Sequence, residues 1–194
     1  KKKYPGITEY LSKKTNSQNK EVMLIYNDSL SVSPITTHLP LREVSKKIST
    51  KKIVQNVITI NNFYKKFLKK KIRFAVTGLN PHCESRERNN EEKKIIIPAI
   101  NLLKKKKIKI EGPFSADTIF IKQNVKNYDV IIGMYHDQVL GPIKTLYEFD
   151  AINITLGLPF LRVSPDHGPN NLMLGKNTSN TKSLEKSLQF LDKI

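Results

Sequence analysis

Short apolar runs alternate along this chain with segments of helical periodicity, and this alternation constrains the fold more than any other feature. In two segments, residues 52–70 and 182–194, apolar side chains recur every three or four positions, as on one face of a helix. Strands that alternate with helices are typical of α/β proteins with a parallel or mixed sheet. We therefore expect an α/β fold with buried strands at residues 22–26, 72–76, 129–134 and 152–156.

Capping and periodicity define further elements. We expect a strand near residues 30–32, a short helix over 41–47, and a helix that begins near Asn89 or Asn90, either of which can cap its first turn. Pro98 lies inside this last pattern and should kink the helix or shift its start. In the final helix, one face is expected to carry Leu184, Leu188 and Leu191.

The formal net charge of +17 raises the possibility of nucleic-acid binding. However, only five of the 34 basic residues are Arg, which is the residue that clamps phosphates and reads bases with a bidentate fork. The many Lys residues stand beside Ile and Asn, a composition that codon bias in an AT-rich genome produces. We favour genome bias, expect no nucleic-acid partner, and keep a basic binding module as an alternative. The charge could also steer anionic substrates to the protein.

Composition also bounds the compartment. Hydrophobic residues make up 38% of the chain, which is enough for a packed core and argues against disorder. A single cysteine, Cys83, excludes an internal disulfide and fits a reducing cytoplasm. No apolar run approaches the roughly 20 residues of a membrane helix, so no membrane partner is expected. The chain starts with Lys1 and not with Met, and we expect it to begin within a longer protein.

Three of the four histidines follow expected strands or turn-forming loops. His82 comes after strand 72–76, His136 comes after strand 129–134, and His38 lies in a loop that Pro40 closes. In open α/β sheets, ligands bind beyond the carboxyl ends of the strands. Three histidines can bind a divalent metal and leave positions open for a substrate. Their long spacing gives no local metal-binding pattern, so ordinary loop histidines are the alternative.

Other polar residues are weaker candidates. Asp137 could ligate a metal or orient a neighbouring histidine. Lys144 and Arg162 have apolar neighbours and nearby prolines, which suits fixed contacts to an anion. His167 lies in a Pro- and Gly-bracketed loop that is more typical of a structural turn, and Cys83 is interpreted as a bystander. No phosphate-binding glycine loop of the Walker or Rossmann kind is present.

Six segments, each modest alone, form a specific set when taken in order. They are residues 36–41 (TTHLPL), 78–82 (GLNPH), 112–113 (GP) with 116–118 (ADT), 134–138 (MYHDQ), 153–160 (NITLGLPF) and 166–168 (DHG). With these segments the chain resembles, over nearly its whole length, the 4-hydroxythreonine-4-phosphate dehydrogenase family of vitamin B6 biosynthesis.

This resemblance implies an α/β/α sandwich with a mixed sheet, similar to the isocitrate and isopropylmalate dehydrogenases, and an active site between two domains. Residues 1–175 would then form the second domain, which carries the metal and substrate sites and the dimer interface. Residues 176–194 would form a C-terminal helix that returns to the first domain. Most of that first domain is not found in these residues, so we expect either a piece of a longer protein or the product of a truncated gene.

The resemblance also assigns roles to residues. The implied metal, zinc, magnesium or cobalt, would be held in a site shared across a homodimer by His38, His82 and His136. Contacts to a small phosphorylated substrate would come from Thr8, Lys144, Asn153 and Arg162. Asp137 and Lys144 are the candidates for proton transfer. NAD or NADP would lie near His167 and Gly168.

The implied reaction is the NAD-dependent oxidation of 4-phosphooxy-L-threonine to a β-keto acid, which decarboxylates to 3-amino-2-oxopropyl phosphate on the route to pyridoxal phosphate. Two departures bear on the substrate. The family's His-Thr pair reads Ile7-Thr8 here, and the loop after His82 reads Cys83-Glu84-Ser85 in place of a Gly-rich pattern. A related dehydrogenase of a four-carbon sugar-acid 4-phosphate is therefore the first alternative.

Overall fold

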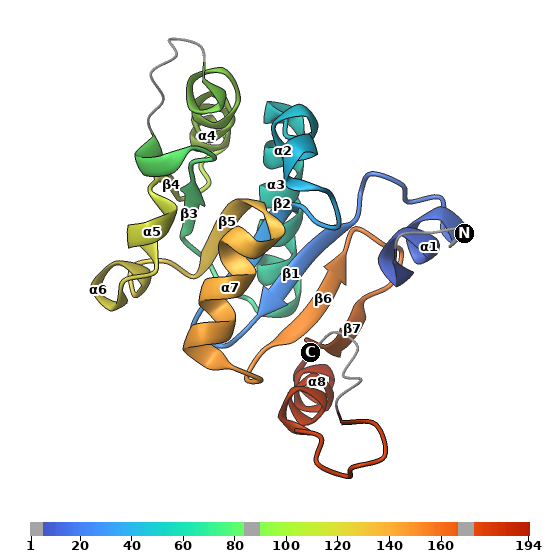
Figure 1. Ribbon diagram of the computed structural model, residues 1–194. Coiled ribbons are helices and arrows are strands. Elements are labelled where there is room, and N and C mark those ends of the chain that lie inside the picture. Colours follow the sequence, from blue (N-terminus) through green and yellow to red (C-terminus); the bar gives the residue numbers. More distant parts are fainter. Residues whose placement is uncertain (1–5, 84–89, 167–172) are drawn as a thin grey trace.

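The computed structural model describes residues 6–83, 90–166 and 173–194, and its centre is a seven-stranded sheet with the strand order β4-β3-β5-β2-β1-β6-β7 (Figure 1). Strands β4, β3, β5 and β2 run parallel to one another, whereas β1 is antiparallel to both β2 and β6, and β7 is antiparallel to β6. The expected mixed sheet is thus confirmed. The strands are β1 Val22–Tyr26, β2 Ser31–Thr36, β3 Phe74–Thr77, β4 Ile110–Phe114, β5 Val130–Tyr135, β6 Ile152–Leu156 and β7 Arg162–Pro165.

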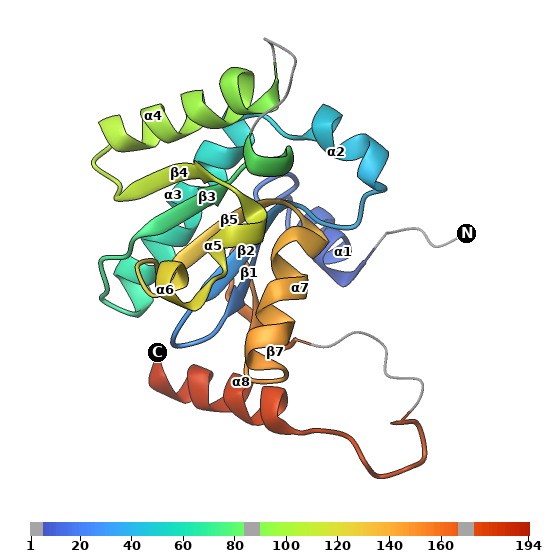
Figure 2. The same cartoon turned by 60° about the vertical axis from the view of Figure 1, so that its left-hand side comes forward.

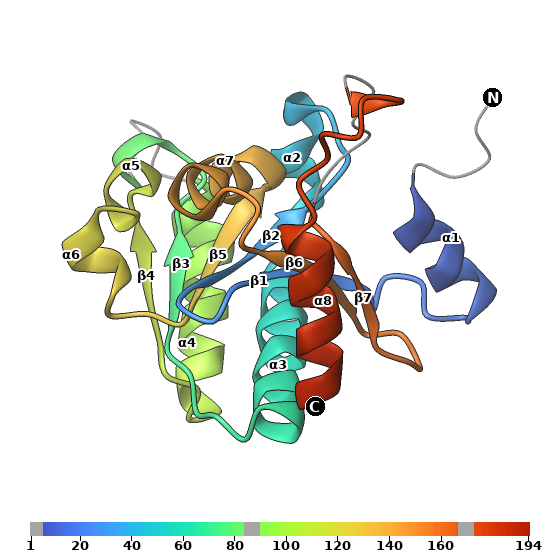
Figure 3. The ribbon, with the colours of Figure 1, turned by 90° about the horizontal axis from the view of Figure 1, so that it is seen from below.

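Helices cover both faces of the sheet, as the view from below shows for α3 and α4 on one side and α5 and α7 on the other (Figure 3). Among the described residues, no helix has the length and apolarity needed to cross a membrane. The helices are α1 Ile7–Lys14, α2 Leu41–Lys47, α3 Thr50–Phe67, α4 Ile97–Lys105, α5 Ala116–Ile119, α6 Lys122–Val125, α7 His136–Tyr147 and α8 Lys182–Lys193.

The core forms on both faces because successive side chains of a strand point to opposite sides. In β5, Val130, Ile132 and Met134 face the helices α3 and α4, and Ile131 faces α5 and α7. A strand covered on both faces reads as a continuous apolar run. This is why the four expected strands could be placed from the sequence.

The start of α4 shows how a proline moves a helix boundary. Asn90 accepts a hydrogen bond from the backbone N–H of Lys93 at 3.0 Å, so it caps this segment, while Asn89 lies outside the described residues. A π-helical turn at Glu92–Ile96 follows, and Pro98 lies in the first turn of α4. A proline is tolerated there because the first N–H groups of a helix have no intrahelical partner. The helical segment thus begins beside Asn90 as expected, and its regular α-helical part starts at Ile97, one residue before Pro98.

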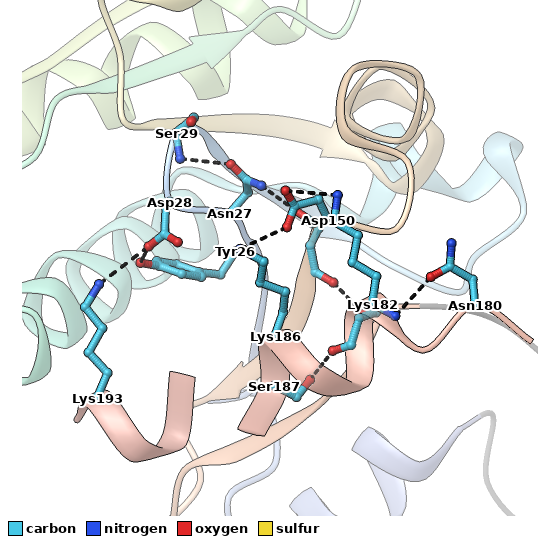
Figure 4. A network of polar contacts seen from close by, with 12 residues as sticks. Tyr26, Asn27, Asp28, Ser29, Asp150, Asn180, Lys182, Lys186, Ser187 and Lys193 are labelled. Carbon is cyan, nitrogen blue, oxygen red and sulfur yellow. Dashed lines mark hydrogen bonds and ion pairs between the residues drawn. The ribbon is translucent and has the colours of Figure 1, made fainter. Parts of the chain in front are cut away.

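The C-terminal helix α8 packs against the sheet through its serine and phenylalanine face. Phe190 is buried, with its ring 5.0 Å from that of Tyr26, and Ser183 donates a hydrogen bond to the carbonyl oxygen of Ala151 at 2.5 Å. Asp150 forms ion pairs with Lys182 at 3.3 Å and Lys186 at 3.4 Å (Figure 4).

The leucine face of α8 points the other way. The exposed fractions of Leu184, Leu188 and Leu191 are 50%, 56% and 46%. These three leucines share a face, as expected from their spacing. The part of the chain that the structure describes does not cover this face.

Candidate functional site

Three parallel strands end at the same edge of the sheet, and a histidine follows each of them. His38 lies beyond β2, His82 lies in the 3₁₀ turn Pro81–Cys83 after β3, and His136 is the first residue of α7 after β5. This is the edge at which open α/β sheets bind their ligands. The topology therefore brings together three segments that are far apart in the sequence (Figure 2).

Two of these histidines lie side by side. The ring centroids of His38 and His136 are 5.9 Å apart. The Nδ1 atom of His136 is 2.7 Å from Oδ1 of Asp137, which fixes one side of the ring and leaves Nε2 directed away from that carboxylate. The side chain of Asp137 is otherwise exposed. This pair therefore presents two neighbouring imidazoles at the strand edge.

His82 has a different neighbour. Its backbone lies in the left-handed region, with φ of 56°, and its Nδ1 atom is 3.9 Å from Oδ2 of Asp117 at the start of α5. Its side chain is largely exposed. Within residues 6–83, 90–166 and 173–194, no group of three histidine, cysteine or acidic side chains is close enough to hold a metal ion. A single chain thus pairs two of the three predicted ligands and leaves His82 at the surface.

A buried glutamine ties the ends of the strands together. Oε1 of Gln138 accepts hydrogen bonds from the Thr77 hydroxyl at 2.8 Å and from the Met134 N–H at 2.6 Å, and its Nε2 donates to the Gly78 carbonyl at 2.8 Å. The hydroxyl of Thr36 donates to the Met134 carbonyl at 2.8 Å. These bonds link β2, β3 and β5 where the histidines follow. Gln138 belongs to the motif at 134–138, although no feature of the sequence indicates this role.

A buried glutamate holds the loop that leads to His82. Glu92 accepts hydrogen bonds of 2.8 Å from the backbone N–H groups of Leu79 and Asn80 and from the Asn80 side chain. Burial alone would raise the pKa of Glu92, but these hydrogen bonds outweigh it and hold the pKa below its ordinary value.

Close approach of α7 to β5 depends on a glycine. A Cβ atom built on Gly133 would lie 2.4 Å from Cγ1 of Val139, well inside van der Waals contact. The absent side chain lets the first turn of α7 lie directly over the strand. His136 and Gln138 are consequently held close to the sheet edge.

Lys144 is held by a buried carboxylate. Its Nζ atom is 2.7 Å from Oδ2 of Asp166 and also donates to the Asp166 carbonyl oxygen. Asp166 follows β7, and its own N–H donates to the Ser183 hydroxyl of α8 at 2.8 Å. Asp166 could equally have been the partner of Arg162, but the structure assigns it to Lys144. Lys144 is therefore fixed in place beside the end of β7.

Arg162 and Asn153 lie on adjacent strands with unused hydrogen-bonding capacity. Arg162 donates to the Thr155 hydroxyl at 3.0 Å and makes no ion pair with any described carboxylate, and burial lowers the pKa of its guanidinium. Asn153, two residues before Thr155 on the same face of β6, has a buried Oδ1 atom without a hydrogen-bond partner among the described residues. Half-buried donors and acceptors without partners are suited to binding a polar ligand.

The remaining predicted residues divide into two groups. Thr8 and His38 line one small cavity of about 80 Å³, so α1 lies beside the histidine pair. Ile7 is 55% exposed at the start of the same helix. His167 and Gly168, the predicted cofactor contacts, lie outside the described residues.

Comparison with known proteins gives one consistent family. A family model described as pyridoxal phosphate biosynthetic protein PdxA matches residues 1–191. The 4-hydroxythreonine-4-phosphate dehydrogenase of Sulfurihydrogenibium sp. (strain YO3AOP1) is 40% identical over 189 residues, covering 96% of this chain and 58% of the relative. The enzyme of the same name from Wigglesworthia glossinidia brevipalpis is 42% identical over 190 residues, covering 97% and 57%.

Solved structures agree with this result. A crystal structure of 4-hydroxythreonine-4-phosphate dehydrogenase from Klebsiella pneumoniae superposes with a TM-score of 0.80 at 32% identity, covering 97% of this chain and 59% of that one. A terephthalate 1,2-cis-dihydrodiol dehydrogenase from Burkholderia xenovorans LB400, at 17% identity and a TM-score of 0.76, shares the fold. The chain spans just under three fifths of the length of the relatives described, with 57–59% covered.

Proposed function

Since this chain belongs to the PdxA family of pyridoxal phosphate biosynthetic proteins, we propose that it supplies the metal- and substrate-binding part of a 4-hydroxythreonine-4-phosphate dehydrogenase. The reaction is the NAD- or NADP-dependent oxidation of 4-phosphooxy-L-threonine to a β-keto acid, which loses carbon dioxide to give 3-amino-2-oxopropyl phosphate. The observation that carries the proposal is the family match over residues 1–191. It favours an enzyme over a basic binding module.

The donor set fits a divalent metal. His136 contacts Asp137 through Nδ1, which leaves Nε2 as the ligand atom, and His38 lies beside it with ring centroids 5.9 Å apart. Imidazole nitrogens suit zinc and cobalt better than magnesium, which prefers oxygen ligands. When bound, the metal would supply a Lewis acid for the substrate's alcohol oxygen, and the nicotinamide would accept the hydride.

We propose that the third imidazole comes from a second copy of the chain. The pair of His38 and His136 lacks a third ligand among the described residues, and His82 is exposed beside Asp117. In a twofold dimer, His82 of each protomer would complete the pair on the other. A homodimer with shared active sites would then be required for metal binding.

The anionic groups of the substrate would be held by side chains of α1, α7, β6 and β7. Arg162 and Lys144 supply positive charge, Asn153 and Thr8 supply neutral hydrogen bonds, and charge-assisted bonds of this kind are the stronger ones. Because Asp166 holds the ammonium of Lys144, we assign Lys144 to binding and not to proton abstraction. The 2.7 Å contact between Oδ1 of Asp137 and Nδ1 of His136 supports a role for Asp137 in orienting the imidazole.

The extent of the chain bears on activity. The remaining length of its relatives is not spanned by these 194 residues, so we expect the cleft to be incomplete here and the isolated chain to be inactive. We further propose that the exposed leucine face of α8 packs against the part of the relatives that these 194 residues do not span. Residues 1–175 would then form the second domain, with the metal and substrate sites. Residues 176–194 would form the helix that returns to the first domain.

A direct assay tests the proposed function. We expect a protein that carries the full length of the relatives to reduce NAD with 4-phosphooxy-L-threonine, to need Zn²⁺ or Co²⁺, and to lose activity in His136→Ala. Robust NAD reduction by the purified 194-residue chain would contradict the incomplete cleft. Absence of turnover by the longer protein with every divalent metal would contradict the dehydrogenase.

One observation favours a second candidate, a dehydrogenase of a four-carbon sugar-acid 4-phosphate. Ile7, next to Thr8, is exposed and cannot form a hydrogen bond through its side chain. The amino group of 4-phosphooxy-L-threonine corresponds to a hydroxyl group in the sugar-acid phosphates. Without a hydrogen-bonding side chain at position 7, the protein would lack one contact that could distinguish these two groups. Comparing kcat/KM for 4-phosphooxy-L-threonine with that for threonate and erythronate 4-phosphates decides between the two substrates.

A further inference from the structure

A carboxylate from outside the sheet faces the histidine at the end of β2. Glu9, in the first turn of α1, places Oε1 at 3.6 Å from Nδ1 of His38. The Oε2 atom of the same carboxylate is buried and has no hydrogen-bond partner among the described residues. The backbone at Gly6 lies close to this oxygen, since a Cβ atom built on Gly6 would be only 2.8 Å from Oε2.

This carboxylate is not what attaches α1 to the domain. Ser12, which is 1% exposed, donates from its hydroxyl to Glu21 at 2.8 Å and anchors the helix near its middle. A carboxylate oxygen that is buried without a partner is unfavourable for folding. Fold stability therefore gives no reason for a carboxylate at position 9.

A carboxylate oxygen lies within 3.9 Å of Nδ1 at all three candidate ligands, and at His136 the distance is that of a hydrogen bond. The Nδ1 atom of His136 faces Asp137 at 2.7 Å, and that of His82 faces Asp117 at 3.9 Å. A metal-bound histidine commonly donates its other ring N–H to a carboxylate, which sets the tautomer and the orientation of the ring. Asp137 adjoins its histidine in the sequence, and Asp117 lies just after β4. Glu9 must be brought to His38 by α1.

We propose that Glu9 is the positioning residue of His38, holding the proton on Nδ1 so that Nε2 is free to bind a divalent cation. This inference rests on the metal role proposed above for His38. Glu9 acts through the imidazole and does not itself bind the metal. It also gives α1 a function in the site, because displacement of this helix would release the ring.

The tautomer test uses the metal-free 194-residue chain. Nitrogen-15 NMR of the imidazole should show His38 protonated on Nδ1 in the wild type, and the proton should move toward Nε2 in Glu9→Ala. Glu9→Gln keeps an acceptor oxygen and should retain most of the wild-type tautomer. The melting temperature should stay level or rise, whereas a merely structural Glu9 would lower it on substitution. A wild-type His38 protonated on Nε2 would overturn the proposal.

Zinc titration supplies the second readout. We expect Glu9→Ala to weaken Zn²⁺ binding about 10- to 100-fold, and to have no further effect in a His38→Ala background. Glu43→Ala is the matched control, because it removes a carboxylate from the neighbouring α2 and should leave zinc affinity unchanged. An additional loss in the His38→Ala background would show direct ligation and overturn the positioning role. If the wild type binds no zinc, the metal proposal fails, and the tautomer measurement still decides on Glu9.

Discussion

At the scale of single residues, Gln138 holds the ends of β3 and β5 in register. Its side chain satisfies the Thr77 hydroxyl, the Met134 N–H and the Gly78 carbonyl, all of them buried. Gln138→Ala removes the partners of the Met134 N–H and the Gly78 carbonyl and leaves the Thr77 hydroxyl only a 3.4 Å bond to the Ile132 carbonyl, so we expect the free energy of unfolding to fall by about 2–4 kcal/mol. Urea unfolding followed by circular dichroism measures this. Gln123→Ala, at an exposed position in α6, should change stability by less than about 0.5 kcal/mol.

Glu92 should make the His82 loop acid-sensitive. Its pKa in the folded protein lies below the unfolded value, which is about 4.3. A depressed carboxyl pKa stabilises the fold above the unfolded pKa, and this stabilisation is lost as the pH falls through the folded pKa. We therefore expect Glu92→Gln to lose about 1–3 kcal/mol at neutral pH.

The measurement is a set of urea titrations of both proteins from neutral pH down to about pH 3. The stability gap between wild type and Glu92→Gln should be constant at neutral pH and should narrow below about pH 4.3. A gap that stays constant down to the lowest pH would mean that the Glu92 carboxylate is not a source of acid sensitivity.

Arg162 is expected to bind the substrate's phosphate or carboxylate. Loss of one charge-assisted hydrogen bond corresponds to about 1.5–3 kcal/mol, or roughly tenfold to a hundredfold in kcat/KM. In a protein with the full length of the relatives, we expect Arg162→Lys to lower kcat/KM and Arg162→Ala to lower it further. Metal content should not change. Arg73→Lys is the control. Arg73 is exposed and directly precedes β3, at the end of the strand opposite to His82, so kcat/KM should stay unchanged.

A purely structural Arg162 gives the opposite pattern. Its one described side-chain contact is the bond to Thr155, so a structural role would lower the melting temperature on substitution and preserve kcat/KM. Measuring both quantities on one preparation separates the two outcomes.

His82 and His136 could be proposed as site residues from the sequence because each follows a recognisable strand, and His38 because it lies in a loop that Pro40 closes. Glu9, Glu92 and Gln138 could not be proposed in the same way, since their partners are backbone groups or side chains that only the fold brings near. Glu9 and His38 are 29 positions apart in the sequence, and no periodic pattern of residues indicates that they lie close together.

At the scale of elements, β1, β3, β5 and β6 could be predicted from the sequence, β2 only near its start, and the peripheral strands could not. β4 and β7, at the two ends of the sheet, are partly exposed and contain prolines, so neither forms a continuous apolar run. Helix α7 was missed because Gly141 and Pro142 interrupt it, and tertiary packing over β5 overrides their low helix propensity. The sheet edge was therefore predictable, but the helix that begins with His136 was not.

Helix α8 should detach when its one large buried side chain is removed. Phe190 packs against Tyr26 and Phe63, and a Phe→Ala change in a core costs about 3–5 kcal/mol. We expect Phe190→Ala to abolish hydrogen-exchange protection in α8 while the central strands stay protected. Leu188→Ala, on the exposed face, should leave protection in the 194-residue chain unchanged. Loss of protection throughout the domain in Phe190→Ala would show that α8 is part of the main cooperative unit.

At the scale of the whole molecule, the proposed site requires two chains, and complementation tests this. Each site would combine His38 and His136 of one protomer with His82 of the other, so His82→Ala and His136→Ala should each bind zinc weakly as homodimers. After the two variants are unfolded, mixed equally and refolded together, half of the dimers should contain one of each. Such a heterodimer has one intact site and one that lacks two ligands. Tight zinc binding should therefore return to about one quarter of the wild-type capacity. A mixture that binds no more zinc than the separate variants would show that all three imidazoles belong to one chain, or that the site does not form.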